Sequence, residues 1–159
     1  MDFCKNKEMQ LEQMLPLLEE QLALGKTVRF YPRGVSMLPL IRENIDSVML
    51  ASAPPTLQKY DLPLYRRTDG QFILHRIVGV EEDTYVCRGD NQLQPEPGVR
   101  HEQVVALVIG FYRGERYHSI TEWRYRLYCR CHTALQSLRR FMRRAAGWLR
   151  RHLCGRTGT

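Results

Sequence analysis

The alternation of short β-type segments and turns between residues 45 and 112 is the feature that most constrains the fold of this chain. Five segments are rich in β-branched and aromatic residues: IDSVMLAS, LPLYRR, FILHRIVGV, TYVCRGD and VVALVIGFYR. Turn-forming residues separate them at 54–55, 69–70, 82–83 and 95–98, and the Asp-Gly pair at 69–70 is typical of a hairpin. No helix-forming segment lies between them to cover a sheet. We therefore expect a mainly β body that is closed or coiled on itself.

The two ends of the chain differ from this body. Residues 5–24 predict an amphipathic helix, perturbed by Pro16 and ended at Gly25, and residues 27–31 predict a strand. In residues 119–153 apolar side chains recur every three or four positions, with most arginines off that stripe. This pattern predicts one long helix, or two with a bend near Gly147. The expected organisation is an N-terminal helix (1–26), a β domain (27–113) and a basic helical tail (114–159).

The charge of the chain is unevenly divided. Residues 1–112 carry 12 Lys/Arg against 15 Asp/Glu, a net of −3, whereas residues 113–159 carry 12 Arg against two Glu, a net of +10. A length of 159 residues suits one domain with a real core. Residues 1–24 contain seven charged side chains, and no window has the roughly 18 uncharged apolar residues of a membrane span. We expect neither a signal peptide nor a transmembrane segment. Because the excess of positive charge lies in residues 113–159, any polyanionic partner would bind to this tail.

The cysteines indicate no metal site. Five are present, and the spacing of Cys129 and Cys131 fits neither a zinc knuckle nor a redox motif. On a helix those two side chains would point about 200° apart. We expect free thiols in a reducing cytosol, with no metal and no organic cofactor.

Three segments bring together the groups of a serine hydrolase. GVSMLPL (34–40) offers the hydroxyl of Ser36, ILHRIVGV (73–80) the imidazole of His75, and RGDNQ (88–92) with its following loop the acids Asp90 and Glu96. In such an enzyme a base activates a weak alcohol and a carboxylate orients that base. The order Ser, His, acid matches neither chymotrypsin nor subtilisin, and the GxSxG motif of α/β-hydrolases is absent.

Over residues 28–112 the chain resembles the type I signal peptidases and their serine-peptidase superfamily, which also contains the LexA-like self-cleaving domains. The resemblance rests on SMLP at 36–39, KYDLPLYRR at 59–67, RGDN at 88–91 and VVALVIGFY at 104–112. It implies the coiled β fold of that superfamily, and a serine endopeptidase that cleaves a leader- or signal-type peptide without a cofactor. It also implies that the substrate is a peptide or precursor protein. Substrate-binding residues are not assigned.

The resemblance also implies which residue takes each catalytic role. ILHRIV is similar to the endoplasmic-reticulum and archaeal branch, in which histidine replaces lysine as the base, so His75 takes that role. The acid of that branch corresponds to Glu96, where the family has aspartate; the third role is left open between Glu96 and Asp90, which also suits a turn. Gly34 stands where bacterial relatives carry a serine that aids the oxyanion, so the Ser36 backbone N–H would supply this hydrogen bond. On a strand, His75 would face a cleft and Arg76 the solvent.

The basic tail has three interpretations. With Trp123 and Trp148 it is typical of a helix that lies on an anionic membrane surface. Nucleic acid is a less favoured partner, and a helix that packs its apolar stripe on the body is the third interpretation. The first predicts a cytoplasmic protein that is peripheral at the inner face of the membrane. The alternative to an enzyme is a catalytically degenerate relative that binds peptide or membrane.

Overall fold

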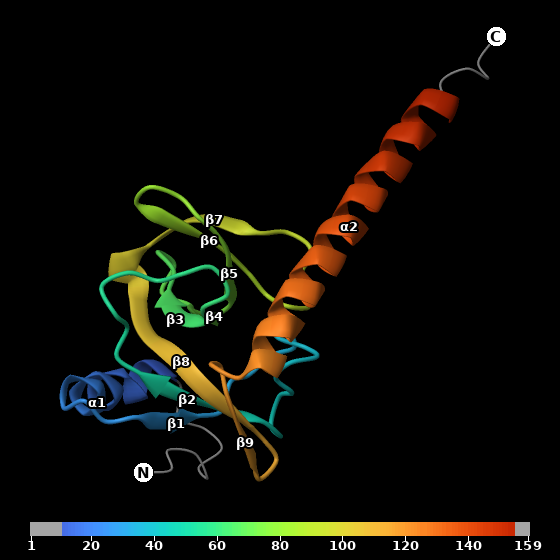
Figure 1. The fold of residues 1–159 in the computed structure, drawn as a ribbon. Coiled ribbons are helices and arrows are strands. Elements are labelled where there is room, and N and C mark those ends of the chain that lie inside the picture. Colours follow the sequence, from blue (N-terminus) through green and yellow to red (C-terminus); the bar gives the residue numbers. More distant parts are fainter. Residues whose placement is uncertain (1–10, 155–159) are drawn as a thin grey trace.

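The computed structural model describes the backbone of residues 11–154 and the side chains of residues 13–143. Two helices flank a body of short strands (Figure 1). The elements in chain order are α1 (Leu11–Ala23), β1 (Val28–Phe30), β2 (Ser47–Ala51), β3 (Pro63–Arg66), β4 (Phe72–Leu74), β5 (Arg76–Val80), β6 (Thr84–Arg88), β7 (Glu96–Arg100), a 3₁₀ turn (His101–Gln103), β8 (Val104–Arg113), β9 (Arg116–Ser119) and α2 (Trp123–Cys154). The prediction of a mainly β protein with helices at both ends is confirmed.

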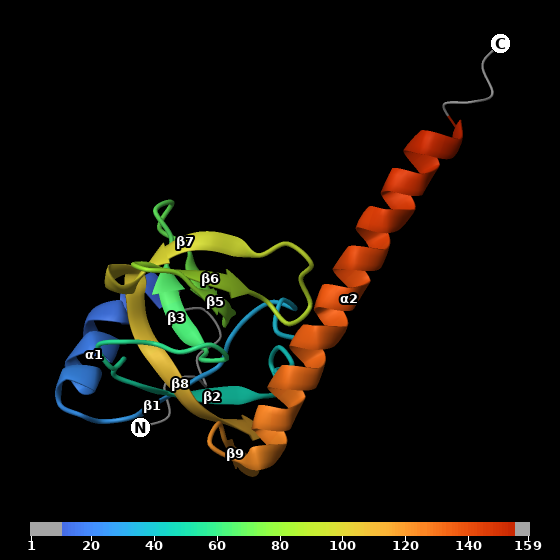
Figure 2. The same ribbon diagram turned by 45° about the horizontal axis from the view of Figure 1, so that its top comes forward.

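The strands form two antiparallel sheets. The larger has the order β1-β2-β8-β3-β4, with β9 added to β8, and the smaller has the order β5-β6-β7. The long strand β8 runs through the body and carries β2 on one stretch and β3 on another (Figure 2). Register shifts at Met49/Leu50 and Leu64/Tyr65 mark irregularities in these pairings, which bend and twist a sheet.

Two apolar clusters form the core. The larger joins Leu18 and Leu22 of α1, strands of the large sheet and Tyr125 and Cys129 of α2. The smaller lies around Tyr65 and connects the two sheets. Both helices therefore bury part of their surface on the β body, as sheets in a single-domain protein require.

Helix α1 ends as its sequence predicts. Gly25 adopts φ +71°, its N–H donates to the Leu22 carbonyl (2.9 Å), and the Lys26 N–H donates to the Gln21 carbonyl (3.0 Å). This is a Schellman cap, in which glycine takes the left-handed conformation at low cost. Pro16 lies inside the helix without ending it. Residues 5–10 of the predicted helix lie outside the described residues.

Three expectations about strands were wrong. The predicted strand 72–80 divides at His75 into β4 and β5, which belong to different sheets. The predicted break at 95–98 lies largely within β7, an edge strand that tolerates proline because it pairs on one side only. The predicted tail begins with β9, whose Tyr117 ring occupies the space that a side chain at Gly110 would need.

Helix α2 is one continuous helix of 32 residues with no break at Gly147. Its first turns pack on the body, and the rest extends away from it (Figures 1 and 2). The predicted apolar stripe does not make this contact, because Trp123, Leu127 and Leu138 are exposed. Tyr125, Cys129 and Gln136 face the body instead. The predicted position of Trp148 falls outside the described side chains.

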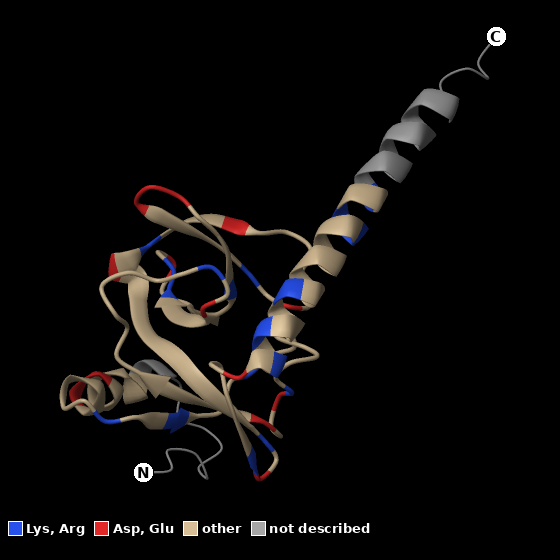
Figure 3. Ribbon diagram, viewed as in Figure 1, with Lys and Arg blue, Asp and Glu red and all other residues tan. Residues whose placement is uncertain are grey.

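Arginines follow the described part of α2, whereas acidic residues are found mainly on the β body (Figure 3). Among the described residues, no helix has the length and apolarity to cross a bilayer.

Candidate active site

Ser36 lies half-buried in the turn that follows β1. Its carbonyl accepts a hydrogen bond from the Asn91 N–H (2.8 Å), and Asn91 Nδ2 donates to the Val35 carbonyl (3.2 Å). The segment around the predicted nucleophile is therefore held against the turn that contains RGDN, although 55 positions separate Ser36 from Asn91 in the sequence. Two of the three predicted segments thus meet in space.

Gly89 joins the third segment to this pair. A Cβ atom at Gly89 would lie 2.7 Å from the Ser36 carbonyl oxygen and 3.1 Å from His75 Nε2. The first of these contacts is with backbone, which cannot move aside easily, so only glycine permits this approach. The backbone of Ser36 and the ring of His75 therefore lie close together across Gly89. Within the described residues, Ser36 Oγ forms no hydrogen bond to His75. Catalytic hydrogen bonds are often long before substrate binds.

A small cavity of about 80 Å³ adjoins Ser36. The side chains of Ile73 and Leu74 on β4 form part of its wall. Since β4 is the last of the described strands in this part of the large sheet, a backbone edge that no described strand pairs with lies beside this cavity. The cavity thus offers room and backbone hydrogen-bonding groups next to Ser36, whereas His75 is not among its lining residues.

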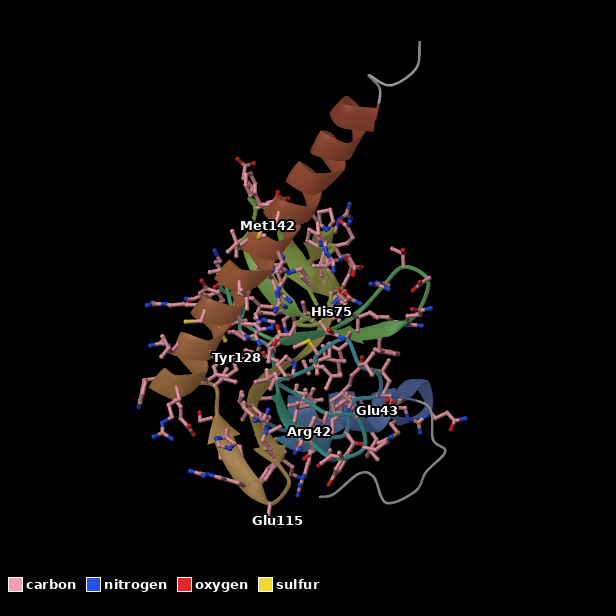
Figure 4. The ribbon with its side chains drawn as sticks, turned by 90° about the vertical axis from the view of Figure 1, so that its right-hand side faces the viewer. Arg42, Glu43, His75, Glu115, Tyr128 and Met142 are labelled. Carbon is pink, nitrogen blue, oxygen red and sulfur yellow. The ribbon has the colours of Figure 1, made fainter. Side chains whose placement is uncertain are left out.

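His75 lies inside the body, between β4 and β5 (Figure 4), and is only 3% exposed. The expectation of an imidazole in an open cleft was wrong, because the chain crosses from one sheet to the other at this residue. Burial lowers the pKa of His75 from 6.5 to about 4; Glu96 raises it and Arg67 lowers it further. His75 is therefore neutral at pH 7, the form in which imidazole can accept a proton.

Tyr65 connects His75 to Glu96. The Tyr65 hydroxyl donates to Glu96 Oε2 (2.8 Å), and its oxygen lies 3.4 Å from His75 Nδ1. Because the single hydroxyl proton is directed at Glu96, the Tyr65 oxygen accepts from Nδ1–H. This arrangement favours the tautomer with the proton on Nδ1 and a free lone pair on Nε2, the nitrogen that lies near Gly89. Tyr65 was not predicted as a site residue, since its alternating strand carries no functional signal.

Arg67 holds Glu96 in place. Arg67 Nε and Nη2 donate to the two carboxylate oxygens at 2.6 and 2.5 Å. This pairing lowers the pKa of Glu96 against the opposing effect of burial, and the Tyr65 hydrogen bond lowers it further. Glu96 sits on β7 opposite Cys87, and not in a loop as expected. In the described structure its carboxylate reaches His75 through Tyr65 and makes no direct hydrogen bond to it.

Asp90 has a different set of partners. Its carboxylate accepts from Arg76 Nε (2.9 Å) and Nη2 (2.8 Å) and from the Tyr128 hydroxyl (3.1 Å). Its backbone carbonyl accepts from Gln136 on α2. No hydrogen bond between Asp90 and His75 is formed in the described part of the chain. Of the two candidate acids, only Glu96 is linked by hydrogen bonds to the imidazole.

The expectation that Arg76 meets solvent was wrong. Arg76 does point away from His75, but α2 covers that face and leaves Arg76 1% exposed. Besides Asp90, Arg76 donates to the Tyr125 hydroxyl (2.8 Å), Cys129 Sγ (2.9 Å) and the Tyr60 carbonyl (3.2 Å). This buried ion pair attaches the helix to the body next to the candidate site.

The remaining predicted groups are structural or isolated. Cys87 and Cys129 are buried free thiols and Cys131 is an exposed one. Burial, followed by the charge of Glu96, raises the pKa of Cys87 to about 12, so it stays protonated. The described residues contain no group of three or more His, Cys, Asp or Glu side chains that could hold a metal ion.

Comparison of the chain with protein-family models, curated proteins and solved structures gave no match.

Proposed function

We propose that this protein is a serine endopeptidase with the coiled β fold of the signal peptidase and LexA-like superfamily. The observation that supports this most is that the backbone carbonyl of Ser36 and Nε2 of His75 both lie against Gly89, although the three residues belong to segments that are distant in the sequence. A structural serine and a structural histidine have no need to meet in this way. The neutral, correctly oriented imidazole adds support.

In the proposed reaction, Ser36 Oγ attacks the carbonyl carbon of the scissile peptide bond as its proton passes to His75 Nε2. The imidazolium that forms is stabilised by Nδ1–H donation to Tyr65, whose own hydrogen bond to Glu96 strengthens the acceptor. The Ser36 backbone N–H, which has no acceptor among the described residues, donates to the oxyanion. His75 then returns the proton to the leaving amine, and water hydrolyses the acyl-enzyme by the same steps.

The substrate we propose is an extended leader- or signal-type peptide. Its backbone would pair with the free edge of β4, which would carry the scissile bond past the cavity beside Ser36. The expected location is the cytoplasm, at the inner face of the membrane. The exposed apolar side chains and arginines of α2 support attachment to an anionic lipid surface.

A second candidate function is peptide or membrane binding by a degenerate relative. The burial of His75 and the absence of a Ser36–His75 hydrogen bond among the described residues favour it. Without a base that reaches Oγ, Ser36 would be an ordinary alcohol.

Reaction of the full-length protein with a fluorophosphonate probe separates the two functions. The enzyme should be labelled on Ser36 at a rate that His75→Gln reduces on the order of 10²-fold or more. Ser36→Ala should abolish labelling, and Ser47→Ala is the matched control because Ser47 is buried elsewhere in the body. Labelling that persists in Ser36→Ala would remove Ser36 as the nucleophile, and no labelling of a folded wild-type protein would favour the binding module.

A further inference from the structure

Arg88, the last residue of β6, is a buried cation, and two of its three guanidinium nitrogens have no hydrogen-bond partner among the described residues. Its side chain is 4% exposed. Within the described part of the chain, Nε and one terminal nitrogen of its guanidinium are shielded from solvent and donate to nothing. Buried polar groups in native proteins almost always have a partner, and an unpaired buried charge is especially unfavourable. An arginine in this environment would be stabilised by a bound anion.

Two further nitrogen atoms on α2 share this condition. His132 Nδ1 and Arg140 Nε are also buried and unpartnered among the described residues. They lie eight residues apart with Gln136 midway, so all three share one face of the helix. Gln136 donates to the Asp90 carbonyl, which sets this face against the turn that begins at Arg88. The ribbon views agree that the chain leaving β6 runs beside α2 (Figures 1 and 2).

The neighbouring charges do not neutralise this cluster. Burial lowers the pKa of Arg88, and repulsion from Arg140 lowers it further, whereas the charge of Asp90 raises it. Asp90 is already bound through both carboxylate oxygens to Arg76. Burial also lowers the pKa of His132; the charge of Asp90 raises it, and the charges of Arg76, Arg88 and Arg139 lower it. The region therefore holds an excess of positive charge.

We propose that Arg88, His132 and Arg140 form a binding site for a phosphate-type oxyanion between β6 and α2. Phosphate has acceptor oxygens in several directions, and guanidinium binds it through two parallel hydrogen bonds. Arg88 Nε and Nη2, both unpartnered, present such a pair, and Arg140 Nε and His132 Nδ1 approach from the helix. The oxyanion comes either from free phosphate in solution or from a lipid headgroup, since the helix that carries two of the donors is the proposed membrane element.

The test uses the full-length protein and inorganic phosphate, with ionic strength held constant by exchange against chloride. Arginine Nε–Hε resonances are followed by NMR, because the Nε–H of Arg88 is buried and reports on contact with an anion. We expect a saturable shift of the Arg88 resonance, and a loss of phosphate affinity of about tenfold or more in Arg140→Met. The matched control is Arg130→Met, an exposed arginine on the same helix, which should titrate as the wild type does.

Arg88→Met supplies a second measurement that does not depend on the resonance. Removal of an unpaired buried charge should stabilise the protein in phosphate-free buffer, so Arg88→Met should unfold at a higher temperature than the wild type there. At saturating phosphate this advantage should disappear, because only the wild type gains stability from the ligand.

A parallel arm with phosphatidic acid vesicles, compared with phosphatidylcholine vesicles, identifies the source of the oxyanion. A response to phosphate, to phosphatidic acid or to both supports the site and assigns it to the soluble or the lipid form. The proposal is overturned if neither probe shifts the Arg88 resonance, or if Arg140→Met and Arg130→Met bind phosphate equally well.

Discussion

The buried imidazole of His75 should make the stability of this protein depend on pH in a defined direction. In the folded protein burial lowers the pKa of His75 to about 4, against an ordinary value of 6.5. Between these two pH values the unfolded chain binds a proton at this position and the folded chain does not. Stability from this residue is therefore complete above pH 6.5, falls as the pH drops from 6.5 to 4, and is constant below pH 4.

The magnitude follows from the two pKa values. Linkage gives a loss of about 2 kcal/mol in the free energy of unfolding between pH 7 and pH 5, and about 3 kcal/mol in total below pH 4. His75→Gln removes the titration while it keeps a polar side chain of similar size. The variant should therefore lose about 2 kcal/mol less than the wild type between pH 7 and pH 5.

Urea denaturation at a series of pH values, for both proteins, measures this difference. An NMR titration of the His75 ring gives the pKa directly and does not depend on enzymatic activity. If the protein is a peptidase, the acid limb of kcat/KM should also lie nearer pH 4 than pH 6.5. A ring that titrates at pH 6.5 or above, or equal pH dependence of stability in the two proteins, would refute the reasoning.

Other variants test the neighbours of His75 and the helix. Tyr65→Phe and Glu96→Gln should each lower kcat/KM roughly 10²-fold or more. The double variant should be no worse than either single variant, because both residues act on the same imidazole, and additive losses would contradict the link through Tyr65. Asp90→Asn should lower the free energy of unfolding in urea by about 3–5 kcal/mol, since it leaves a buried arginine unpaired, and a cost below about 1 kcal/mol would contradict that. Phe141→Asp, at an exposed apolar position of α2, should weaken sedimentation with phosphatidylserine vesicles about tenfold with unchanged thermal stability; unchanged sedimentation would remove this face from the membrane contact.

Local patterns were sufficient for the fold class and for most elements. Segments rich in β-branched and aromatic residues between turn-forming residues predicted β2, β3, β6 and β8, and the glycine after α1 predicted its end. These features depend on residues that are near one another in the sequence. The division of 72–80 at His75 was not predictable in this way, because it depends on which sheet each half joins.

The candidate site was predictable only in part, for the same reason. Ser36, His75 and Glu96 were recognised as residue types able to perform the chemistry. The role of Tyr65 was missed because a tyrosine on an apolar strand is ordinarily a core residue, and its hydroxyl becomes informative only once both of its partners are known. Arg76 was assigned the correct face of its strand but the wrong surroundings, since α2 covers that face. Strand periodicity predicts the side of the sheet to which a side chain points, and it does not predict whether that side chain is buried.

The packed face of α2 illustrates a further limit. Hydropathy selected the stripe through Trp123 and Leu138, yet the residues that contact the body include Tyr125 and Gln136. The body presents a buried ion pair and a backbone carbonyl at this position, so hydrogen-bonding side chains pack there and apolar ones remain outside. A helix that must satisfy buried polar groups need not dock through its most apolar face.

Three consecutive residues connect the candidate site to the helix. Arg88 and Asp90 are two positions apart and both face α2, whereas Gly89 between them lies against Ser36 and His75, as alternation along an extended chain requires. Asp90 cannot leave Arg76 on β5 without abandoning a buried charge, and Tyr128 and Gln136 of α2 both donate to Asp90, so the turn is bound to the body and to the helix. Any event that loosens α2 therefore acts on Gly89, the residue that separates the proposed nucleophile from its base. Because α2 is also the proposed lipid-binding element, we predict that attachment to a membrane would act on the geometry of Ser36 and His75 through this turn.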